Sequence, residues 1–180
     1  KNLKVHLDGA RLFNAHIKTG LSMKQLTSSF DSVSICLSKG LGAPVGSLLV
    51  ADQETIDKAH RLRKMLGGGR RQVGVIASCG LYALKNNIQR LQEDHDNAKI
   101  LAEGLSSIEE LSVDFSESQT NMVFVNCPEQ HRESLERFLF DKEIIISNLD
   151  RGRLVCHLGI DEKDIHFVIA TFKDYCKSKA

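Results

Sequence analysis

Long apolar runs are missing from this sequence of 180 residues: none approaches the roughly 20 residues that a membrane-spanning helix needs. A strong basic excess is missing too, because the formal net charge is only +1. General nucleic-acid binders and membrane-surface binders usually carry such an excess. No secretory signal is visible at the start, where Lys-Asn-Leu-Lys-Val-His leads straight into strand-like sequence. We therefore expect neither a nucleic-acid partner nor a membrane partner.

The five cysteines form no CxxC pair and no zinc-binding pattern, so we expect no metal site. Their number is odd and they are widely spaced, at Cys36, Cys79, Cys127, Cys156 and Cys176. Most have apolar neighbours, which is typical of buried free thiols in a reducing compartment. This favours a cytoplasmic location over secretion.

The composition is that of an ordinary globular protein and not of a disordered one, with 42% hydrophobic and 26% charged residues. The sequence shows no internal repeat and no low-complexity tract. Its length is sufficient for one full domain or two small ones.

One glycine-rich stretch, residues 38–46 (Ser-Lys-Gly-Leu-Gly-Ala-Pro-Val-Gly), lies between two apolar runs. This order predicts a strand over residues 33–37, a tight turn, and a second strand over residues 47–50. The glycines allow backbone conformations that side chains forbid, and they let a bulky ligand approach the main chain. The stretch carries a single lysine, Lys39, directly after the first strand.

Lys39 is the candidate for covalent chemistry. Burial at a strand end would disfavour its charge and lower its pKa from about 10.4, which leaves more free amine to attack a carbonyl. We therefore hypothesise that Lys39 forms a Schiff base with pyridoxal phosphate (PLP). The alternative is an ordinary surface lysine on a hairpin, and the lysine alone does not decide between the two.

Asp8 and Arg11 stand where a predicted strand over residues 3–7 ends and a helix over residues 12–20 begins. Open α/β sheets bind their ligands at this kind of edge. Asp8 either caps the following helix, which is common for aspartate, or pairs with the protonated pyridine nitrogen of PLP. The second contact would keep the ring cationic, so that it accepts electrons from a bond breaking at the substrate Cα. Arg11 would point to the same face, toward the ring oxygen or a substrate carboxylate.

Residues 53–66 are predicted to form a helix that Asp52 caps. Three glycines and two arginines, residues 67–71, then break the pattern, and they either bind a phosphate or form a flexible connection. Apolar positions at helical spacing continue from residue 72 to residue 105. A single helix of that length would span about 50 Å at 1.5 Å per residue, so we expect it to connect two domains or to bend midway.

The remaining sequence predicts a small α/β domain of about 75 residues. A final helix over residues 161–176 has Asp161 at its N-cap and Asp164 at the position of a capping box. The other elements expected in this domain are strands near residues 111–115, 122–125, 144–147 and 154–157 and a helix over residues 130–142.

Three segments together resemble the low-specificity L-threonine aldolases, which are PLP enzymes of the aspartate aminotransferase fold (fold type I). They are residues 5–15 (VHLDGARLFNA), 37–46 (LSKGLGAPVG) and 63–72 (RKMLGGGRRQ), with weaker similarities at residues 93–95, 120–124 and 153–158. The resemblance covers essentially the whole chain. It implies an α/β fold, with the C-terminal part of the large PLP-binding domain in residues 1–88. A linking helix and a small α/β C-terminal domain would follow in residues 89–180.

The resemblance also implies roles for individual residues. Lys39 would hold the cofactor as an internal aldimine, Asp8 would meet the pyridine nitrogen, and Arg11 would lie beside the ring oxygen or the substrate. Arg71 matches an arginine near the cofactor phosphate, one that could serve the site of a neighbouring subunit. Arg153 matches the arginine that binds the substrate α-carboxylate, and the alternative for it is a surface arginine at a strand edge.

Two positions depart from the pattern of this family. Arg70 stands where a methionine is expected, and Cys156 stands where a threonine is expected. Family members also carry roughly as many residues again before this segment, including the glycine-rich phosphate loop and the histidine that stacks on the cofactor ring. The general base of the reaction is expected there, so no residue of this chain is assigned to it.

The reaction that the resemblance implies is cleavage of L-threonine or L-allo-threonine to glycine and acetaldehyde, by a lyase of threonine catabolism and glycine biosynthesis. The resemblance further implies a homotetramer with sites at dimer interfaces. Two alternatives stay open. In the first, the chain is a truncated, non-catalytic family member. In the second, it is another fold-type-I PLP enzyme, such as a β-eliminating lyase.

Overall fold

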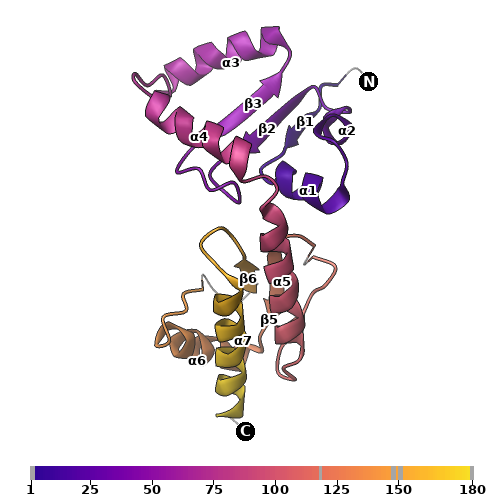
Figure 1. The fold of residues 1–180 in the computed structure, drawn as a ribbon, viewed down its shortest axis with the longest axis vertical. Helices are drawn as coiled ribbons and strands as arrows, with labels where there is room; N and C mark the ends of the chain where they lie inside the picture. The colour runs from indigo at the N-terminus through magenta and orange to yellow at the C-terminus, as the bar shows by residue number, and fades with distance from the viewer. Residues whose placement is uncertain (1–2, 118, 147–148, 150–151, 179–180) are drawn as a thin grey trace. The chain divides into compact units, whose positions relative to one another are not determined.

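The computed structural model describes residues 3–117, 119–146, 149 and 152–178, and it divides into two compact units, Lys1–Leu91 and Gln92–Ala180 (Figure 1). Each unit contains a three-stranded sheet of its own. The sequence placed its domain boundary after residue 88, close to this division. No helix in the described ranges has the length and the apolar character that crossing a membrane requires.

The N-terminal unit consists of β1 (His6–Asp8), α1 (Leu12–Thr19), α2 (Met23–Thr27), β2 (Ser32–Cys36), β3 (Ser47–Ala51), α3 (Gln53–Met65) and α4 (Gly74–Asn86). Its strands lie in the order β1-β2-β3, with β1 parallel and β3 antiparallel to β2. The strand, tight turn and second strand predicted around Lys39 are therefore confirmed. We call residues 37–46, which join β2 to β3, the lysine loop.

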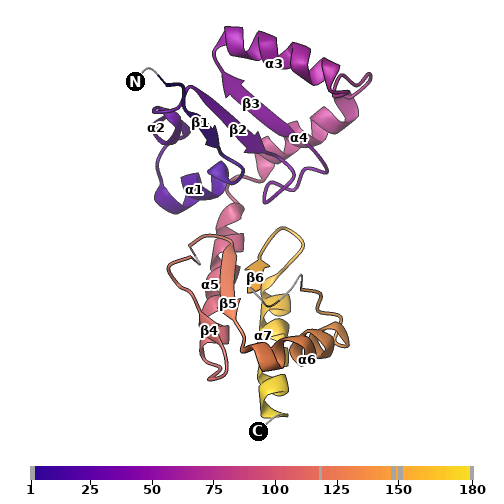
Figure 2. The ribbon, with the colours of Figure 1, turned by 180° about the vertical axis from the view of Figure 1, so that it is seen from behind.

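The two faces of this sheet are covered differently. Val33 and Ile35 of β2 are buried on one face, where they share a cluster with Leu12 of α1. Residues alternate between faces along a strand, so Ser34 and Cys36 lie on the other face, where they are only half-buried. Figure 2 shows the unit from the side on which the strands lie in front of α4. The strand sequence thus separates a packed apolar face from a more open, polar one.

The apolar repeat between residues 72 and 105 forms two helices, α4 and α5 (Leu91–Ser106), and not one. α4 ends at Asn86, and residues 87–90 separate it from α5. The expected interruption of this long segment is therefore confirmed.

The C-terminal unit consists of α5, β4 (Ser112–Val113), β5 (Met122–Asn126), α6 (Glu129–Phe140), β6 (Gly152–Val155) and α7 (Glu162–Lys177). Its strands are antiparallel and lie in the order β4-β5-β6. One continuous core joins the three helices to the sheet. Its fully buried side chains include Leu105, Val123, Leu135, Leu139 and Phe172.

Both helix starts that the sequence predicted from aspartate residues are confirmed. The Asp52 carboxylate accepts a hydrogen bond from the Thr55 N–H (2.8 Å) at the start of α3. At the start of α7, Asp161 Oδ1 accepts from the Asp164 N–H (3.0 Å), and Asp164 Oδ2 accepts from the Asp161 N–H in return (3.0 Å). These bonds satisfy N–H groups at helix starts that would otherwise have no protein partner.

The strand predicted at residues 144–147 is wrong for the three residues of that range that the structure describes. The last residue of the range lies outside the described residues. Glu143 adopts a φ of 60°, and the Ile144 N–H donates to the Leu139 carbonyl (2.9 Å), so the chain folds back on the end of α6. Hydrogen bonds that terminate the helix therefore decide the structure here, although the apolar triplet is typical of a strand.

Candidate functional site

The lysine loop is closed by hydrogen bonds within its own backbone. The Leu37 N–H donates to the Gly46 carbonyl (2.9 Å), and the Ala43 N–H donates to the Leu37 carbonyl (3.0 Å). Inside the loop, the Gly42 N–H donates to the Lys39 carbonyl (2.8 Å), which makes a tight turn directly after the lysine. Gly42 and Gly46 have φ values of 74° and 124°, which L side chains rarely adopt, so this turn needs glycine.

Apolar packing and one side-chain hydrogen bond fasten the lysine loop to α4. Leu41 is only 3% exposed and belongs to the same buried cluster as Ala83 of α4. The Asn87 side chain, at the end of α4, donates through Nδ2 to the Leu41 carbonyl (2.7 Å). A Cβ added at Gly80 would lie 3.0 Å from Leu37 Cδ1, so the glycine lets the helix approach the loop closely. The loop's main chain is therefore held both by its own bonds and by α4.

The Lys39 side chain is exposed in this chain, so the prediction that it is buried is wrong. The cause is local. Leu37 and Leu41 on either side of it turn inward, toward α4, and the lysine between them points to the surface. The desolvation of Lys39 that the sequence suggested is therefore absent in this chain by itself. Lys39 does lie directly before a tight turn that backbone hydrogen bonds close.

Asp8 is the last residue of β1, and its side chain is exposed. It does not cap α1, because the N-cap residue of that helix is Arg11 and no side chain bonds to the helix start there. Its Oδ1 instead accepts from the Ala10 N–H (3.1 Å), which fixes the carboxylate beside the turn that follows β1. The helix-capping alternative for Asp8 is therefore wrong, and the carboxylate keeps capacity to accept a further hydrogen bond.

The parallel pairing of β1 and β2 brings Asp8 and the lysine loop to the same edge of the sheet. Asp8 lies opposite Ser34 of β2, and β2 ends at Cys36, three residues before Lys39. The turn after Asp8 packs directly on β2, since the Gly9 N–H donates to the Ser34 carbonyl (2.8 Å). A carboxylate and a primary amine thus stand at the carboxyl ends of two adjacent parallel strands, where open α/β sheets bind ligands.

Arg11 follows three residues after Asp8, at the start of α1, and it is half-buried. Its backbone has φ −126° and ψ 34°, which places it at the junction of the turn and the helix. It is therefore near the same sheet edge, as the sequence predicts. The partner that the resemblance implies for its guanidinium, a ring oxygen or a carboxylate of a ligand, stays a prediction.

The glycine run before Arg71 ends helix α3. Gly67 has a φ of 82°, and its N–H donates to the Lys64 carbonyl (3.2 Å), while the Gly68 N–H donates to the Arg63 carbonyl (2.7 Å). This pair of bonds is a Schellman motif, so two of the three glycine N–H groups are already used. The phosphate-binding alternative therefore depends on the arginine side chains more than on this backbone.

Arg70 and Arg71 are both exposed in the connection between α3 and α4. The middle and the C-terminal end of α4, around Gly80 and Asn87, hold the lysine loop, so Arg71 lies beyond the opposite end of that helix. The structure of this chain does not bring it to Lys39. Its implied role near a cofactor phosphate stays a prediction.

Arg153 is exposed on β6 in the C-terminal unit, where it pairs across the sheet with Phe124 of β5. It borders a cleft of about 600 Å³. Apolar side chains make up much of the lining, among them Ile144, Ile146, Leu154, Ile160, Phe167 and Val168. A guanidinium beside an apolar cleft suits a small ligand that carries a carboxylate.

The thiols of the C-terminal unit are buried, as the sequence predicts. Burial and the neighbouring Asp94 carboxylate raise the pKa of the Cys156 thiol to about 12. Burial and the Glu110 carboxylate raise the pKa of the Cys176 thiol to about 11, and burial also raises the pKa of Cys127. The thiolate is the reactive form, so these three cysteines are poor nucleophiles.

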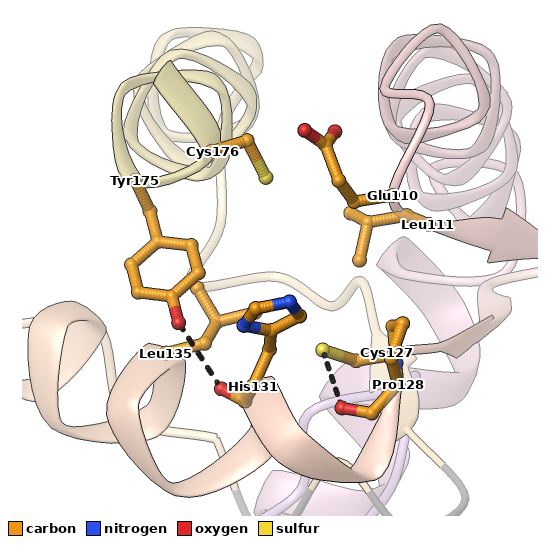
Figure 3. Close-up of a pocket in the computed structure, with 8 residues that line it drawn as sticks. All are labelled: Glu110, Leu111, Cys127, Pro128, His131, Leu135, Tyr175 and Cys176. Carbon is orange, nitrogen blue, oxygen red and sulfur yellow. Dashed lines mark hydrogen bonds between the residues drawn. The ribbon is translucent and has the colours of Figure 1, made fainter. Parts of the chain in front are cut away.

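A small cavity of about 20 Å³ lies between two of these thiols, as Figure 3 shows. Cys127 Sγ donates to the carbonyl of Pro128 (3.6 Å), and the Tyr175 hydroxyl donates to the His131 carbonyl (3.3 Å). A cavity of this volume has room for about one water molecule. The cavity is therefore a packing gap beside the core, and the cleft near Arg153 is the larger candidate for a ligand.

Sequence reasoning assigned no role to the residues that hold the candidate side chains in place. Asn87 bonds to a residue 46 positions earlier, and Asn121 bonds to a residue 35 positions later. Neither pairing leaves a periodic signal in the sequence. Gly152 lies in β6 and approaches β5 closely, but the predicted strand began only at residue 154, so no sequence signal marked this contact.

Known proteins match this chain over almost its whole length. A family model described as beta-eliminating lyase matches residues 1–128. A low specificity L-threonine aldolase from Escherichia coli O157:H7 is 46% identical over 175 residues, which covers 97% of this chain and 52% of the relative. The low-specificity L-threonine aldolase 1 of Arabidopsis thaliana is 44% identical over 176 residues, which covers 95% of this chain and 49% of the relative. The chain spans about half the length of these curated relatives.

Among solved structures, the Leishmania major threonine aldolase matches with a TM-score of 0.76 at 19% identity. The match covers 97% of this chain and 52% of that chain. Similarity at this level of identity shows the fold. It confirms the predicted α/β fold of the fold-type-I PLP enzymes, of which this chain again spans about half.

Proposed function

Because this chain belongs to the beta-eliminating lyase family, we propose that it is the lysine-bearing part of a PLP-dependent enzyme that cleaves L-threonine and L-allo-threonine to glycine and acetaldehyde. The observation that carries the proposal is the meeting of Asp8 and Lys39 at the carboxyl ends of two adjacent parallel strands. The names of the relatives that are 46% and 44% identical support this substrate class.

The residues at this sheet edge fit PLP by their chemistry. Lys39 offers the primary amine that a carbonyl group requires, and Asp8 offers a carboxylate with free acceptor capacity. Both side chains are exposed, so a planar ligand has access to them. When bound, PLP supplies an electron sink for the pair of electrons released at the substrate Cα.

Each residue would have one task toward the cofactor. Lys39 Nζ would hold it covalently, and the closed lysine loop would keep that nitrogen in place. The Asp8 carboxylate would hold a proton on the pyridine nitrogen, and the Arg11 guanidinium would donate to the ring oxygen. Arg71 would donate to a phosphate, within its own subunit or in a neighbouring one. These roles rest on the family pattern and on the shared sheet edge.

Arg153 would bind the α-carboxylate of the substrate, because its guanidinium is exposed beside a cleft in the C-terminal unit. A carboxylate held in this way fixes the rotation of the substrate and thereby selects which bond at Cα breaks. Cys156, three residues later, stays a neutral thiol at physiological pH, because burial raises its pKa to about 12. It would not compete as a nucleophile.

The oligomeric state and the cellular location belong to the same proposal. A homotetramer with sites at dimer interfaces would explain why Arg71 stands apart from Lys39 within one chain, since it could then reach the site of a partner. The protonated, buried thiols are compatible with a reducing, cytoplasmic environment. Small amino acids would be the substrates, within threonine catabolism and glycine biosynthesis.

The exposure of Lys39 favours a second candidate function. In this second candidate, these 180 residues by themselves do not enclose the cofactor, and they have no catalytic activity. The family description also keeps β-elimination as a rival reaction, in which a substituent leaves from the substrate Cβ. Both candidates are decided by the experiment that follows.

The experiment adds PLP to the 180-residue chain and to the full-length protein, meaning the complete polypeptide in which these residues occur. The absorbance of the lysine-bound cofactor and the release of acetaldehyde are followed in both. We expect Lys39→Ala to abolish both signals in the full-length protein. Lys85→Ala, which removes another exposed lysine at the end of α4, is the matched control and should keep both.

A Lys39→Ala variant that keeps the absorbance band would refute the assignment of the lysine. Full-length protein that binds PLP while the 180-residue chain does not would favour the non-catalytic reading of the short chain. Threonine, serine and a cysteine-type substrate separate the two reactions. An aldolase releases glycine with an aldehyde, whereas a β-eliminating lyase releases a keto acid and ammonia.

A further inference from the structure

Asn121 holds the end of β6 through two hydrogen bonds to one residue. Its side-chain Nδ2 donates to the Cys156 carbonyl (2.9 Å), and its own carbonyl accepts from the Cys156 N–H (2.9 Å). Asn121 is 2% exposed and Cys156 is 1% exposed, so both bonds are shielded from water. We call this pair the Asn121–Cys156 clamp.

A second fixed point lies on the other side of Arg153. A Cβ added at Gly152 would lie 2.6 Å from the Val125 carbonyl oxygen. β6 therefore approaches β5 there more closely than a residue with a side chain would allow. Arg153 follows Gly152 directly and precedes Cys156 by three residues. The arginine is thus held between a close backbone contact and the Asn121–Cys156 clamp.

The register of β6 decides which way Arg153 points. Side chains alternate between the two faces of a strand, so a slip by one residue would turn the arginine to the opposite face. β6 is short, Gly152–Val155, and it pairs with β5 alone in the described sheet. A short edge strand has few ladder bonds to define its register. A bond outside the ladder therefore has a large influence on where the guanidinium lies.

Stability alone does not account for an asparagine at this position. A buried amide is costly to desolvate, and Asn121 Oδ1 has no hydrogen-bond partner among the described residues. A leucine of similar branched shape would fill the space without that cost, and it would in turn leave the Cys156 carbonyl without its side-chain donor, so the two changes roughly offset each other. Only the side-chain amide can donate the hydrogen bond to the Cys156 carbonyl. This bond would help to fix which residues of β6 pair with β5.

We infer that Asn121 is a positioning residue for Arg153, and that it acts on the substrate carboxylate through the register of β6. The inference rests on the proposed function, in which Arg153 binds that carboxylate. Asn121 itself touches no substrate in this account. Its removal should therefore weaken substrate binding without removing any reacting group.

The test is a double-mutant cycle in the full-length protein, with threonine as substrate. We expect Asn121→Ala to raise KM about ten-fold, the loss typical of one buried hydrogen bond, and to change kcat by less than about three-fold. In the Arg153→Ala background, the same change should have no further effect on KM, because Asn121 acts through the arginine. Asn126→Ala, at the exposed end of β5, is the matched control and should leave KM unchanged.

A second variant separates function from stability. Asn121→Leu keeps the branched shape and removes the unsatisfied oxygen, so the thermal midpoint should stay within a few degrees of the parent while KM still rises. Hydrogen exchange at the Cys156 amide should become faster in both Asn121 variants and stay unchanged in Asn126→Ala. This readout needs no bound cofactor.

Three outcomes would overturn the inference. In the first, Asn121→Leu restores the KM of the parent, which would make the role one of packing. In the second, the KM effect of Asn121→Ala is equally large without Arg153, which would show that it acts elsewhere. In the third, Arg153→Ala leaves KM unchanged. That result would remove the carboxylate assignment from the proposed function as well, whereas the first two leave the proposed function intact.

Discussion

The two units of this chain differ in how they are held together. The C-terminal unit has one continuous core, in which Leu105, Leu135 and Leu139 are 0% exposed. The described residues of the N-terminal unit form two small buried clusters. This unit also leaves large apolar side chains at the surface, such as Met65 (80% exposed) and Leu66 (86% exposed).

This difference separates the unit with the larger core from the unit that would bind the cofactor. Lys39 and Asp8 belong to the unit with the smaller clusters, and hydrogen bonds within the lysine loop hold the lysine in place there. The N-terminal unit thus buries less of its apolar surface in a core of its own than the C-terminal unit does.

The largest expected effect concerns the core of the C-terminal unit. Leu139→Ala should lower the free energy of unfolding of that unit by about 2–5 kcal/mol, because a fully buried leucine leaves a cavity. Leu48→Ala in the N-terminal unit should cost less than about 1 kcal/mol, since that side chain is already 39% exposed. Urea unfolding followed by circular dichroism measures both, and hydrogen exchange assigns each transition to its unit. Equal losses in the two variants would contradict the comparison.

A matched pair of glycine substitutions gives the next largest effect. Gly152→Ala should destabilise the C-terminal unit by about 1–3 kcal/mol, because the new Cβ would lie 2.6 Å from the Val125 carbonyl oxygen. Gly74→Ala, at the start of α4, meets no atom within 4 Å and should be neutral or stabilise the N-terminal unit by up to about 1 kcal/mol. Thermal melts of the two variants measure the difference. A stabilising Gly152→Ala would show that β6 does not approach β5 as described.

The buried thiols should have the smallest effect on the free energy of unfolding, and this effect depends on pH. The pKa values of Cys156 and Cys176 are raised in the folded state from 9.0 to about 12 and about 11, chiefly by burial. The unfolded chain therefore loses these protons first. Stability from the neutral thiols is fully present below pH 9 and declines as the pH rises toward 11 and 12. Cys156→Ala should weaken this alkaline dependence, and unfolding curves at pH 8 and pH 10 would measure it.

Alkylation gives a companion measurement for the same thiols. Iodoacetamide at pH 8 should label the half-buried Cys36 and Cys79 of the N-terminal unit in the folded protein. The three buried thiols of the C-terminal unit should react only after unfolding. Early labelling of Cys156, found by mass spectrometry of its peptide, would argue against the packed core.

Local patterns in the sequence predicted the local structure well. The caps at Asp52 and Asp161 and the turn after Lys39 depend on residues a few positions apart, so their chemistry is visible in the sequence. The sequence placed Asp8 at a strand end, and the family resemblance implied that Asp8 and Lys39 contact the same cofactor. The parallel pairing of β1 and β2 brings Asp8 and the lysine loop to one edge of the sheet, and the contact with a cofactor stays a prediction.

Features set by long-range packing could not be predicted. The exposure of Lys39 depends on which neighbours turn toward α4, and the sequence does not state that direction. Asn87 and Asn121 bond across 46 and 35 residues, and an isolated asparagine carries no sign of such a partner. The apolar residues after Glu143 were predicted as a strand because a short apolar run is typical of one. The hydrogen bonds that end α6 leave no comparable pattern in the sequence.

We propose that Lys39 is the residue that holds PLP. Full-length protein mixed with PLP can be reduced with borohydride, which makes the link between lysine and cofactor permanent, and then digested for mass spectrometry. We expect the phosphopyridoxyl mass on the peptide that contains Lys39, at about one label per chain, and none on the peptide that contains Lys85. A stoichiometric label on another lysine, with Lys39 unmodified, would contradict it.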